Sequence, residues 1–263
     1  MHRRRGANGS GIRNLGVARR VAALLGCAVA CAALTACAGG PSGSGPRAGI
    51  INSTDPFESS NRQAHTFNKA LRNAIMPSEA GSSSGLATAW APLHNVLVNL
   101  REPLVFANDL AQGKECAAGA SLRRFMVNST LGVGGLIDVA KRNGIEAHDN
   151  DVGQTLGVWG VPAGPYLDLP LLGPTDLRGA AGQAAEFYID PVDIGLQRAG
   201  AASVIWPRAG LDVLDRSFEA APDLAKLERT SLDGYAALRS AYRQNEAASL
   251  RDDNCPDVLR IKQ

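Results

Sequence analysis

The chain has 263 residues, is 45% hydrophobic and 20% charged, and carries a formal net charge of +2 at pH 7 from 27 Lys and Arg against 25 Asp and Glu. Six of the arginines precede Cys37, so the chain from Cys37 onward has 21 basic and 25 acidic residues, a net charge of −4. This acidic balance argues against a nucleic-acid partner, because proteins that bind nucleic acids neutralise phosphates with an excess of Lys and Arg.

The first 36 residues have the features of an export signal. Arginines occupy positions 3–5, 13, 19 and 20, and residues 21–36 are continuously apolar or small. That stretch is shorter than the roughly 20 apolar residues that a membrane-spanning helix needs. A basic start, a short apolar core and a small-residue end are typical of a signal peptide, so we predict one over residues 1–36.

The signal ends in Leu34-Thr35-Ala36-Cys37, which resembles the bacterial lipobox. We therefore expect Cys37 to become the lipidated N-terminus of the mature protein; the alternative is an ordinary secretory signal with a chance cysteine. The following residues are rich in Gly, Ser, Pro and Ala, which predicts a flexible tether over residues 37–54. Cys116 and Cys255 then remain in an oxidising compartment, where they either form a disulfide or stay as two thiols.

Apolar spacing predicts helices through the first half of the domain. Asp55-Pro56 favours a helix start, and that helix should run to about Ile75 before Met76-Pro77 ends it. Apolar residues from 93 to 104 follow three-to-four spacing, and we expect Pro103 to end this helix and begin another. A glycine cluster at 132–135 separates two further helical patterns.

The second half contains one segment of a different character. Over residues 153–174 glycines and prolines interrupt apolar residues, which predicts a loop or short hairpin with an exposed apolar surface. Short helices are expected at 176–185 and 191–199, and one longer helix with a single apolar stripe over 224–242. Residues 248–263 form a polar tail. Because strand signals are few, we predict a single all-α domain over residues 55–247.

No pattern in the sequence indicates catalysis, a metal site or a cofactor. Residues 81–85 match the hydrolase pattern G-x-S-x-G around Ser83, but no strand precedes them, so a Ser/Gly linker is the better interpretation. His65, His94 and His148 lack metal-ligand spacing, and His65 and His94, which lie on helical stretches, are expected at the surface or at interfaces. Residues 148–151 lack the turn glycine and terminal Glu of a calcium loop and are expected to cap the next element. We predict that the protein is not an enzyme.

Several sequence blocks, in order over residues 55–245, resemble the VacJ/MlaA family of outer-membrane lipoproteins. The blocks are Asp55–Arg62 with Phe67-Asn68; Glu102-Pro103 with Asn108-Asp109-Leu110 and Gln112-Gly113; Arg124-Phe125 with Asn128–Gly135 and Asp138-Val139-Ala140; Gly153–Val161 with Gly164-Pro165-Tyr166 and Leu169-Pro170; and Tyr235 with Arg239–Tyr242. Ser60, Ser129 and Gly179 depart from the residues usual in the family, and Gly179 puts in doubt any contact there that depends on an acid.

The resemblance implies a ring-shaped, largely helical protein on the periplasmic side of the outer membrane. It implies a channel for phospholipids mislocalised to the outer leaflet, which pass to a periplasmic lipid carrier, and it implies trimeric porins as partners. The alternative is a structural lipoprotein that docks on porins without a lipid channel of its own. A lipid hydrolase is disfavoured because no catalytic group accompanies Ser83.

Lipid transport needs amphipathic faces in contact with the bilayer, although the same apolar stripes could form a soluble core. Within the Gly- and Pro-rich segment from Gly157 to Pro174 we expect either a mobile gate or a rigid loop against the membrane. We expect Trp159 and Tyr166 to suit the membrane interface. The candidate residues of this gating or membrane loop are Gly157, Trp159, Gly160, Gly164, Tyr166, Leu169 and Leu171.

Overall fold

The computed structural model describes residues 55–75, 84–256 and 259. These residues belong to one compact unit, Ser53–Gln263, which is separate from the unit Met1–Asn52. The predicted signal peptide, Cys37, the tether over 37–54 and Ser83 lie outside the described residues.

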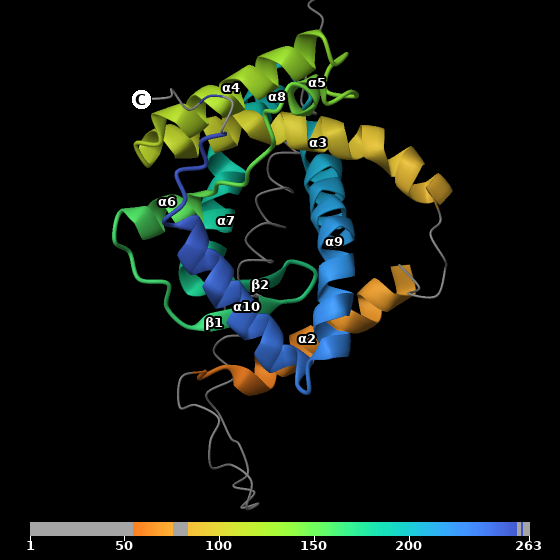
Figure 1. Ribbon diagram of the computed structural model, residues 1–263, viewed down its shortest axis with the longest axis vertical. Helices are drawn as coiled ribbons and strands as arrows, with labels where there is room; N and C mark the ends of the chain where they lie inside the picture. The colour runs from red at the N-terminus through yellow and green to blue at the C-terminus, as the bar shows by residue number, and fades with distance from the viewer. Residues whose placement is uncertain (1–54, 76–83, 257–258, 260–263) are drawn as a thin grey trace, which may run out of the picture. The chain divides into compact units, whose positions relative to one another are not determined.

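The described part of the chain is mainly helical, as predicted (Figure 1). Its elements in chain order are α2 (Glu58–Ile75), α3 (Ser84–Ala111), α4 (Glu115–Thr130), α5 (Val139–Arg142), α6 (Val152–Val158), β1 (Tyr166–Leu169), β2 (Gly173–Asp176), α7 (Leu177–Ile189), α8 (Pro191–Arg198), the 3-10 turn η1 (Ala202–Val204), α9 (Ile205–Thr230) and α10 (Gly234–Ser249). The two strands pair antiparallel, with Tyr166 opposite Asp176 and Leu169 opposite Gly173. The short hairpin expected between residues 153 and 174 is therefore confirmed, although a helix, α6, precedes it.

Aspartate side chains begin several helices and explain why they start where they do. An aspartate at the N-cap accepts a backbone N–H of the first turn and satisfies a donor that the helix leaves unpaired. The caps are Asp151 for α6, Asp176 for α7, Asp190 for α8 and Asp233 for α10.

Two helix boundaries differ from the prediction. Pro103 does not end a helix, because α3 continues through it to Ala111. An interior proline costs roughly 3 kcal/mol, and the burial of Leu104 and Val105 as α3 packs along α4 offsets this cost. The single helix expected over 224–242 is also wrong: Ser231 is extended, and Asp233 begins a new helix by accepting the N–H of Ala236.

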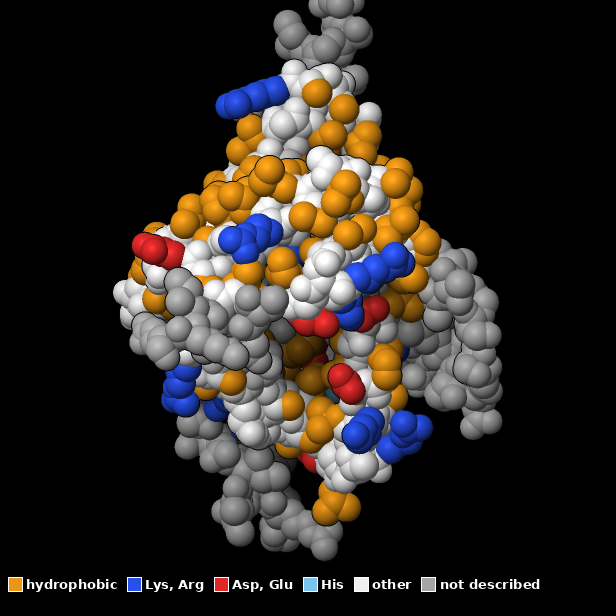
Figure 2. Space-filling model, turned by 45° about the horizontal axis from the view of Figure 1, so that its top comes forward, with side chains coloured by type: hydrophobic (Ala, Val, Ile, Leu, Met, Phe, Trp, Pro, Cys, Tyr) orange, Lys and Arg blue, Asp and Glu red, His pale blue; other side chains and the backbone are white. Residues whose placement is uncertain are grey.

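The helices of this unit surround a central hollow. In Figure 1, α3 and α4 lie across one end, α9 runs along one side, α2 lies at the opposite end, and the hairpin, α10 and α6 complete the other side. Figure 2 shows that the surface is hollowed between these elements, with acidic and basic side chains at the rim of the hollow. The domain is therefore ring-like, and its joints and inner wall are where a site has to be sought.

Candidate functional site

Polar side chains, rather than a large apolar core, join the elements around the hollow. Between α9 and α2, Glu228 pairs with Arg72 at 2.7 Å and with Lys69 at 3.3 Å. Between α3 and α9, Asp215 accepts hydrogen bonds from Trp90 at 2.8 Å and contacts His94 Nδ1 at 3.0 Å. These joints are largely enclosed, so each bond forms in a low dielectric and leaves a costly unpaired group if it breaks.

The same kind of joint holds the hairpin and α6. Asn61 on α2 donates to the carbonyl of Tyr166 and accepts the N–H of Asp168, both at 3.0 Å. Gln112, at the end of α3, donates to the hydroxyl of Thr155 on α6 at 2.9 Å. His65, on α2, lies 3.6 Å from Asp168 and 3.8 Å from Glu228. The two helical histidines, His65 and His94, are thus interface groups, as expected.

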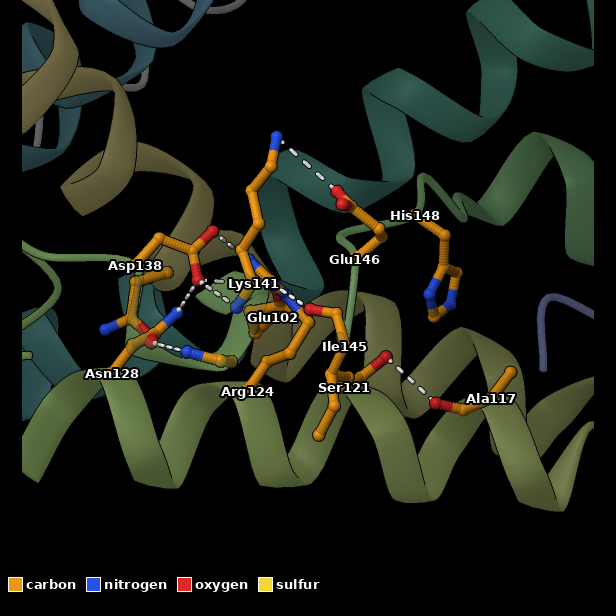
Figure 3. A network of polar contacts seen from close by, with 12 residues as sticks. Glu102, Ala117, Ser121, Arg124, Asn128, Asp138, Lys141, Ile145, Glu146 and His148 are labelled. Atoms are coloured by element: carbon orange, nitrogen blue, oxygen red, sulfur yellow. Dashed lines mark hydrogen bonds and ion pairs between the residues drawn. The ribbon is translucent and has the colours of Figure 1, made fainter. Parts of the chain in front are cut away.

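Arg124 is the centre of a buried network that fixes the turn after α4 (Figure 3). Its side chain has no exposed surface and contacts Glu102 at 2.5 Å, Asp138 at 2.9 Å and the carbonyl of Ile145 at 2.6 Å. Asn128 donates to Asp138 and accepts the N–H of Ala140, both at 3.0 Å. Burial raises the pKa of Glu102 to about 7, although the guanidinium of Arg124 opposes this shift.

Asp109 is a second buried centre and anchors the segment before α6. It accepts hydrogen bonds from Ser121 at 2.9 Å and from Asn150 at 2.7 Å, and His148 Nε2 lies 2.9 Å from it. The expectation that residues 148–151 form a capping loop is therefore correct, because Asp151 caps α6. Among the described residues, no group of three or more His, Cys, Asp or Glu could hold a metal ion.

A further group of charged side chains links α3, α9 and the segment before α6; we call it the Arg101 cluster. It consists of Arg101, Asp149, Asp212 and Arg216. Arg101 contacts Asp149 at 2.7 Å and Asp212 at 3.8 Å, and Arg216 contacts Asp212 at 3.0 Å. Arg101 in turn holds the pKa of Asp149 below its ordinary value.

Large apolar side chains face outward along α4 and the turn that follows it; we call this the α4 apolar surface. Figure 2, in which the end formed by α3 and α4 comes forward, shows hydrophobic side chains spread across it. Its exposed members are Leu122, Met126, Leu131, Val133, Leu136 and Ile137. No helix in the described part of the chain is long and apolar enough to cross a membrane. Leu122 and Met126 on α4 are 42% and 57% exposed, so the apolar stripe of this helix is not buried in the core of the domain.

Comparisons with known proteins agree with this architecture. The sequence model of the MlaA lipoprotein family matches residues 53–249. The chain belongs to the MlaA lipoprotein family.

Several known proteins are about 30% identical to the chain over most of its length. The intermembrane phospholipid transport system lipoprotein MlaA of Escherichia coli (strain K12) is 30% identical over 73% of this chain and 76% of its own length. The protein of the same name from Haemophilus influenzae is 31% identical over 77% and 82%. An uncharacterised protein of Rickettsia prowazekii is 31% identical over 79% and 84%.

A solved structure described as "Structural basis for maintenance of bacterial outer membrane lipid asymmetry" is similar to the chain in fold. The TM-score is 0.55 at 28% sequence identity, covering 75% of this chain and 99% of the other. The mainly helical fold that the sequence predicted, because strand signals are few, is thus confirmed.

The candidate residues of the gating or membrane loop occupy several different environments. Gly157 lies in α6, where an added Cβ would meet Leu250 at 2.7 Å, so this glycine serves close packing. Trp159 is 63% exposed and donates to the carbonyl of Ala111 at 3.0 Å. Gly160 and Gly164 have positive φ angles of 91° and 76°, which favour glycine.

Tyr166 does not lie at a membrane interface, and that expectation is wrong. Its side chain is 1% exposed and packs edge-on against Tyr235 at 6.0 Å and Tyr242 at 5.7 Å. The hairpin register turns Tyr166 inward, where burial raises the pKa of its hydroxyl. In the same hairpin, Leu169 is half-buried, and Leu171 at the turn is 55% exposed with a φ of 71°.

Cys116 and Cys255 are joined by a disulfide in the structure, with their Cα atoms 5.3 Å apart. The bond connects the first turn of α4 to the segment after α10, and Lys114 donates to the carbonyl of Ser249 nearby. The residues up to Cys255, which the sequence suggested were a loose tail, are thereby held on the domain.

No sequence motif predicted the Arg101 cluster, whose members are far apart in the chain. One signal was present: within the 28 residues of α3 the charged residues Arg101, Glu102 and Asp109 interrupt an otherwise apolar and neutral sequence. A charge on such a helix needs a partner or a polar cavity. Glu102 and Asp109 belong to the family's motif blocks and are buried, whereas Arg101 lies outside those blocks.

Proposed function

We propose that this chain is a lipoprotein that removes mislocalised phospholipids from the outer leaflet of the outer membrane and passes them towards the inner membrane, so that lipid asymmetry is maintained. Relatives of the same family bear the name of an intermembrane phospholipid transport system, and the similar solved structure concerns outer-membrane lipid asymmetry. Transport of intact lipids requires no covalent chemistry, and we propose no enzymatic step and no cofactor.

One observation carries this proposal: large apolar side chains are exposed along α4, while charged side chains lie at the rim of the hollow. The α4 apolar surface faces outward, while the Arg101 cluster and the rim of the hollow are charged. Apolar side chains outside can contact acyl chains, and a polar interior can receive a lipid headgroup. A soluble protein of this size normally buries the side chains that are exposed here.

The anchoring and the partners are also part of the proposal. Export by residues 1–36, lipidation of Cys37 and a tether over 37–54 would place the domain on the periplasmic side of the outer membrane. Multiple acyl chains together with the α4 apolar surface would hold it there stably, since one chain alone binds weakly. A soluble periplasmic carrier would receive the lipid, and a trimeric porin would be the neighbour within the membrane.

We further propose that the segment from Gly157 to Pro174 controls lipid passage. The positive φ angles at Gly160 and Gly164 support a role that depends on backbone geometry. Replacing both glycines with valine should leave the variant in the membrane but change the amount of phospholipid in the outer leaflet. An inserted variant with unaltered lipid asymmetry would leave the segment as a membrane-contact loop.

The function is tested in cells that lack the chain. Loss of a transporter should raise the phospholipid content of the outer leaflet, measured by surface-specific labelling or enzymatic modification of exposed phospholipids, and the wild-type chain should restore it. A chain that only docks on porins would restore porin complexes and leave no lipid phenotype to rescue. Cys37→Ser should lose both membrane fractionation and rescue; normal membrane-bound mature protein from this variant would contradict lipidation at Cys37.

A further inference from the structure

Arg101 differs from Arg124, although both are arginines that bridge two carboxylates. Arg124 is fully enclosed, and its Nε, Nη1 and Nη2 groups all contact protein oxygens. In Arg101, Nη2 is bonded to Asp149 and Nε faces Asp212, while Nη1 donates to no acceptor among the described residues. Its partner Asp149 is 76% exposed at the side chain. The Arg101 guanidinium, whose side chain is 15% exposed, therefore has one nitrogen without an acceptor in the described part of the chain, beside an exposed carboxylate.

The backbone of Asp149 is held in place by the side chains of its two neighbours. The side chains on either side of it, His148 and Asn150, both bond to the buried carboxylate of Asp109. Alternate side chains in this segment thus point to opposite sides, and Asp149 points away from the core, towards Arg101. A carboxylate held by a fixed backbone beside an open guanidinium forms a preorganised pair of opposite charges.

Resting on the proposed transport function, we propose that Arg101 and Asp149 form a headgroup site for zwitterionic phospholipids that carry an amine. The lipid phosphate binds the Arg101 guanidinium, and the lipid ammonium binds the Asp149 carboxylate. Guanidinium groups bind phosphate oxygens in a bidentate manner, which suits a phosphodiester. The pair is in effect the complement of the dipolar headgroup.

The site requires a lipid with an amine because Arg101 exchanges Asp149 for the lipid phosphate when the headgroup binds. A phosphate that binds Arg101 competes with Asp149 for Nη2. Asp149 and Asp212, which both contact Arg101, are then left with less positive charge to balance them. A zwitterionic headgroup supplies the missing cation, whereas an anionic glycerol headgroup supplies none. The electrostatic cost of displacing Asp149 therefore falls on anionic lipids and favours phosphatidylethanolamine over phosphatidylglycerol.

The test uses the full lipidated protein and vesicles of equimolar phosphatidylethanolamine and phosphatidylglycerol. Native mass spectrometry of protein recovered from these vesicles identifies the headgroups of retained lipids. We expect the wild type to be enriched in phosphatidylethanolamine. Asp149→Asn should lower the ratio of the two lipids about two- to fivefold, the range for one partly exposed ion pair, while total retained lipid changes little. Arg101→Gln should lower the retention of both lipids.

Glu146→Gln is the matched control, because Glu146 lies in the same segment and its side chain is 68% exposed in a surface pair with Lys141. This variant should retain lipids in the wild-type ratio. A wild type that retains phospholipid without headgroup preference, or Asp149→Asn with an unchanged ratio, would overturn the headgroup site and leave the transport function standing. A wild type that retains no phospholipid would overturn the transport function and this site with it.

Discussion

Replacing Arg124 with methionine tests whether buried polar networks hold this fold together. The substitution removes the partners of Glu102 and Asp138 and leaves the carbonyl of Ile145 unpaired, in a site where the arginine has no exposed surface. Removing one partner of a buried ion pair typically costs about 3–5 kcal/mol. We expect Arg124→Met to lower the free energy of unfolding by that amount, measured by urea denaturation of the detergent-solubilised protein.

The adjacent Arg123 provides the control, because it is exposed on the same helix. Arg123→Met makes the same chemical change and should alter the free energy of unfolding by no more than about 0.5 kcal/mol. In the double variant Arg124→Met with Glu102→Gln, part of the loss should be recovered, since the side chain at position 102 no longer carries a charge and only Asp138 is left without its guanidinium partner. If Arg124→Met costs less than about 1 kcal/mol, the network does not stabilise the fold as we argue.

Three other measurements test separate features. Alkylation of the denatured, unreduced mature protein should label neither Cys116 nor Cys255; two labelled thiols would refute the disulfide, whose 139-residue separation allows about 5 kcal/mol of stabilisation in the chain-entropy model. Burial raises the pKa of Glu186 from 4.5 to about 7, so its stabilising contribution is present below pH 4.5 and is lost as the pH rises through 7. Glu186→Gln should remove this pH dependence, about 3 kcal/mol at most, and parallel unfolding profiles of wild type and variant would contradict the shift. Leu122→Gln with Met126→Gln should weaken vesicle binding of the unlipidated protein with little change in unfolding free energy, because both side chains are exposed; unchanged binding would show that this surface does not contact lipid.

Local rules predicted much of the secondary structure. Asp176 and Asp190 stand before apolar-periodic segments, and both cap helices close to the predicted starts. The hairpin followed from the density of glycine and proline between residues 153 and 174. The prediction failed where tertiary packing overrides a local signal, as at Pro103, where burial along α4 carries the helix through a proline.

The site could not be predicted in the same way, because its contacts are long-range. The motif blocks identified Asn61, Asp109 and Arg124 as notable polar residues, but nothing local indicates that Asn61 bonds to Tyr166, 105 residues away. The sequence also did not show what the apolar stripe of α4 contacts. Helical spacing tells which residues share a face, but not what that face packs against. The inward-turned Tyr166 shows the same limit, because the hairpin register decides its orientation.

The pairing of Asp55 with α10 has a consequence for the order in which the domain is assembled. Asp55 accepts hydrogen bonds from the hydroxyl of Tyr235 and from Arg239, which lie 180 and 184 positions later in the chain. Because the chain is synthesised from its N-terminus, Asp55 cannot make these contacts, which close the ring, until α10 has been synthesised. Contacts of such high sequence separation form slowly, so the side chain of Tyr166, which packs against Tyr235 and Tyr242 of α10, would be exposed to the solvent before closure. We accordingly expect newly exported chains to need protection from aggregation until α10 docks against Asp55.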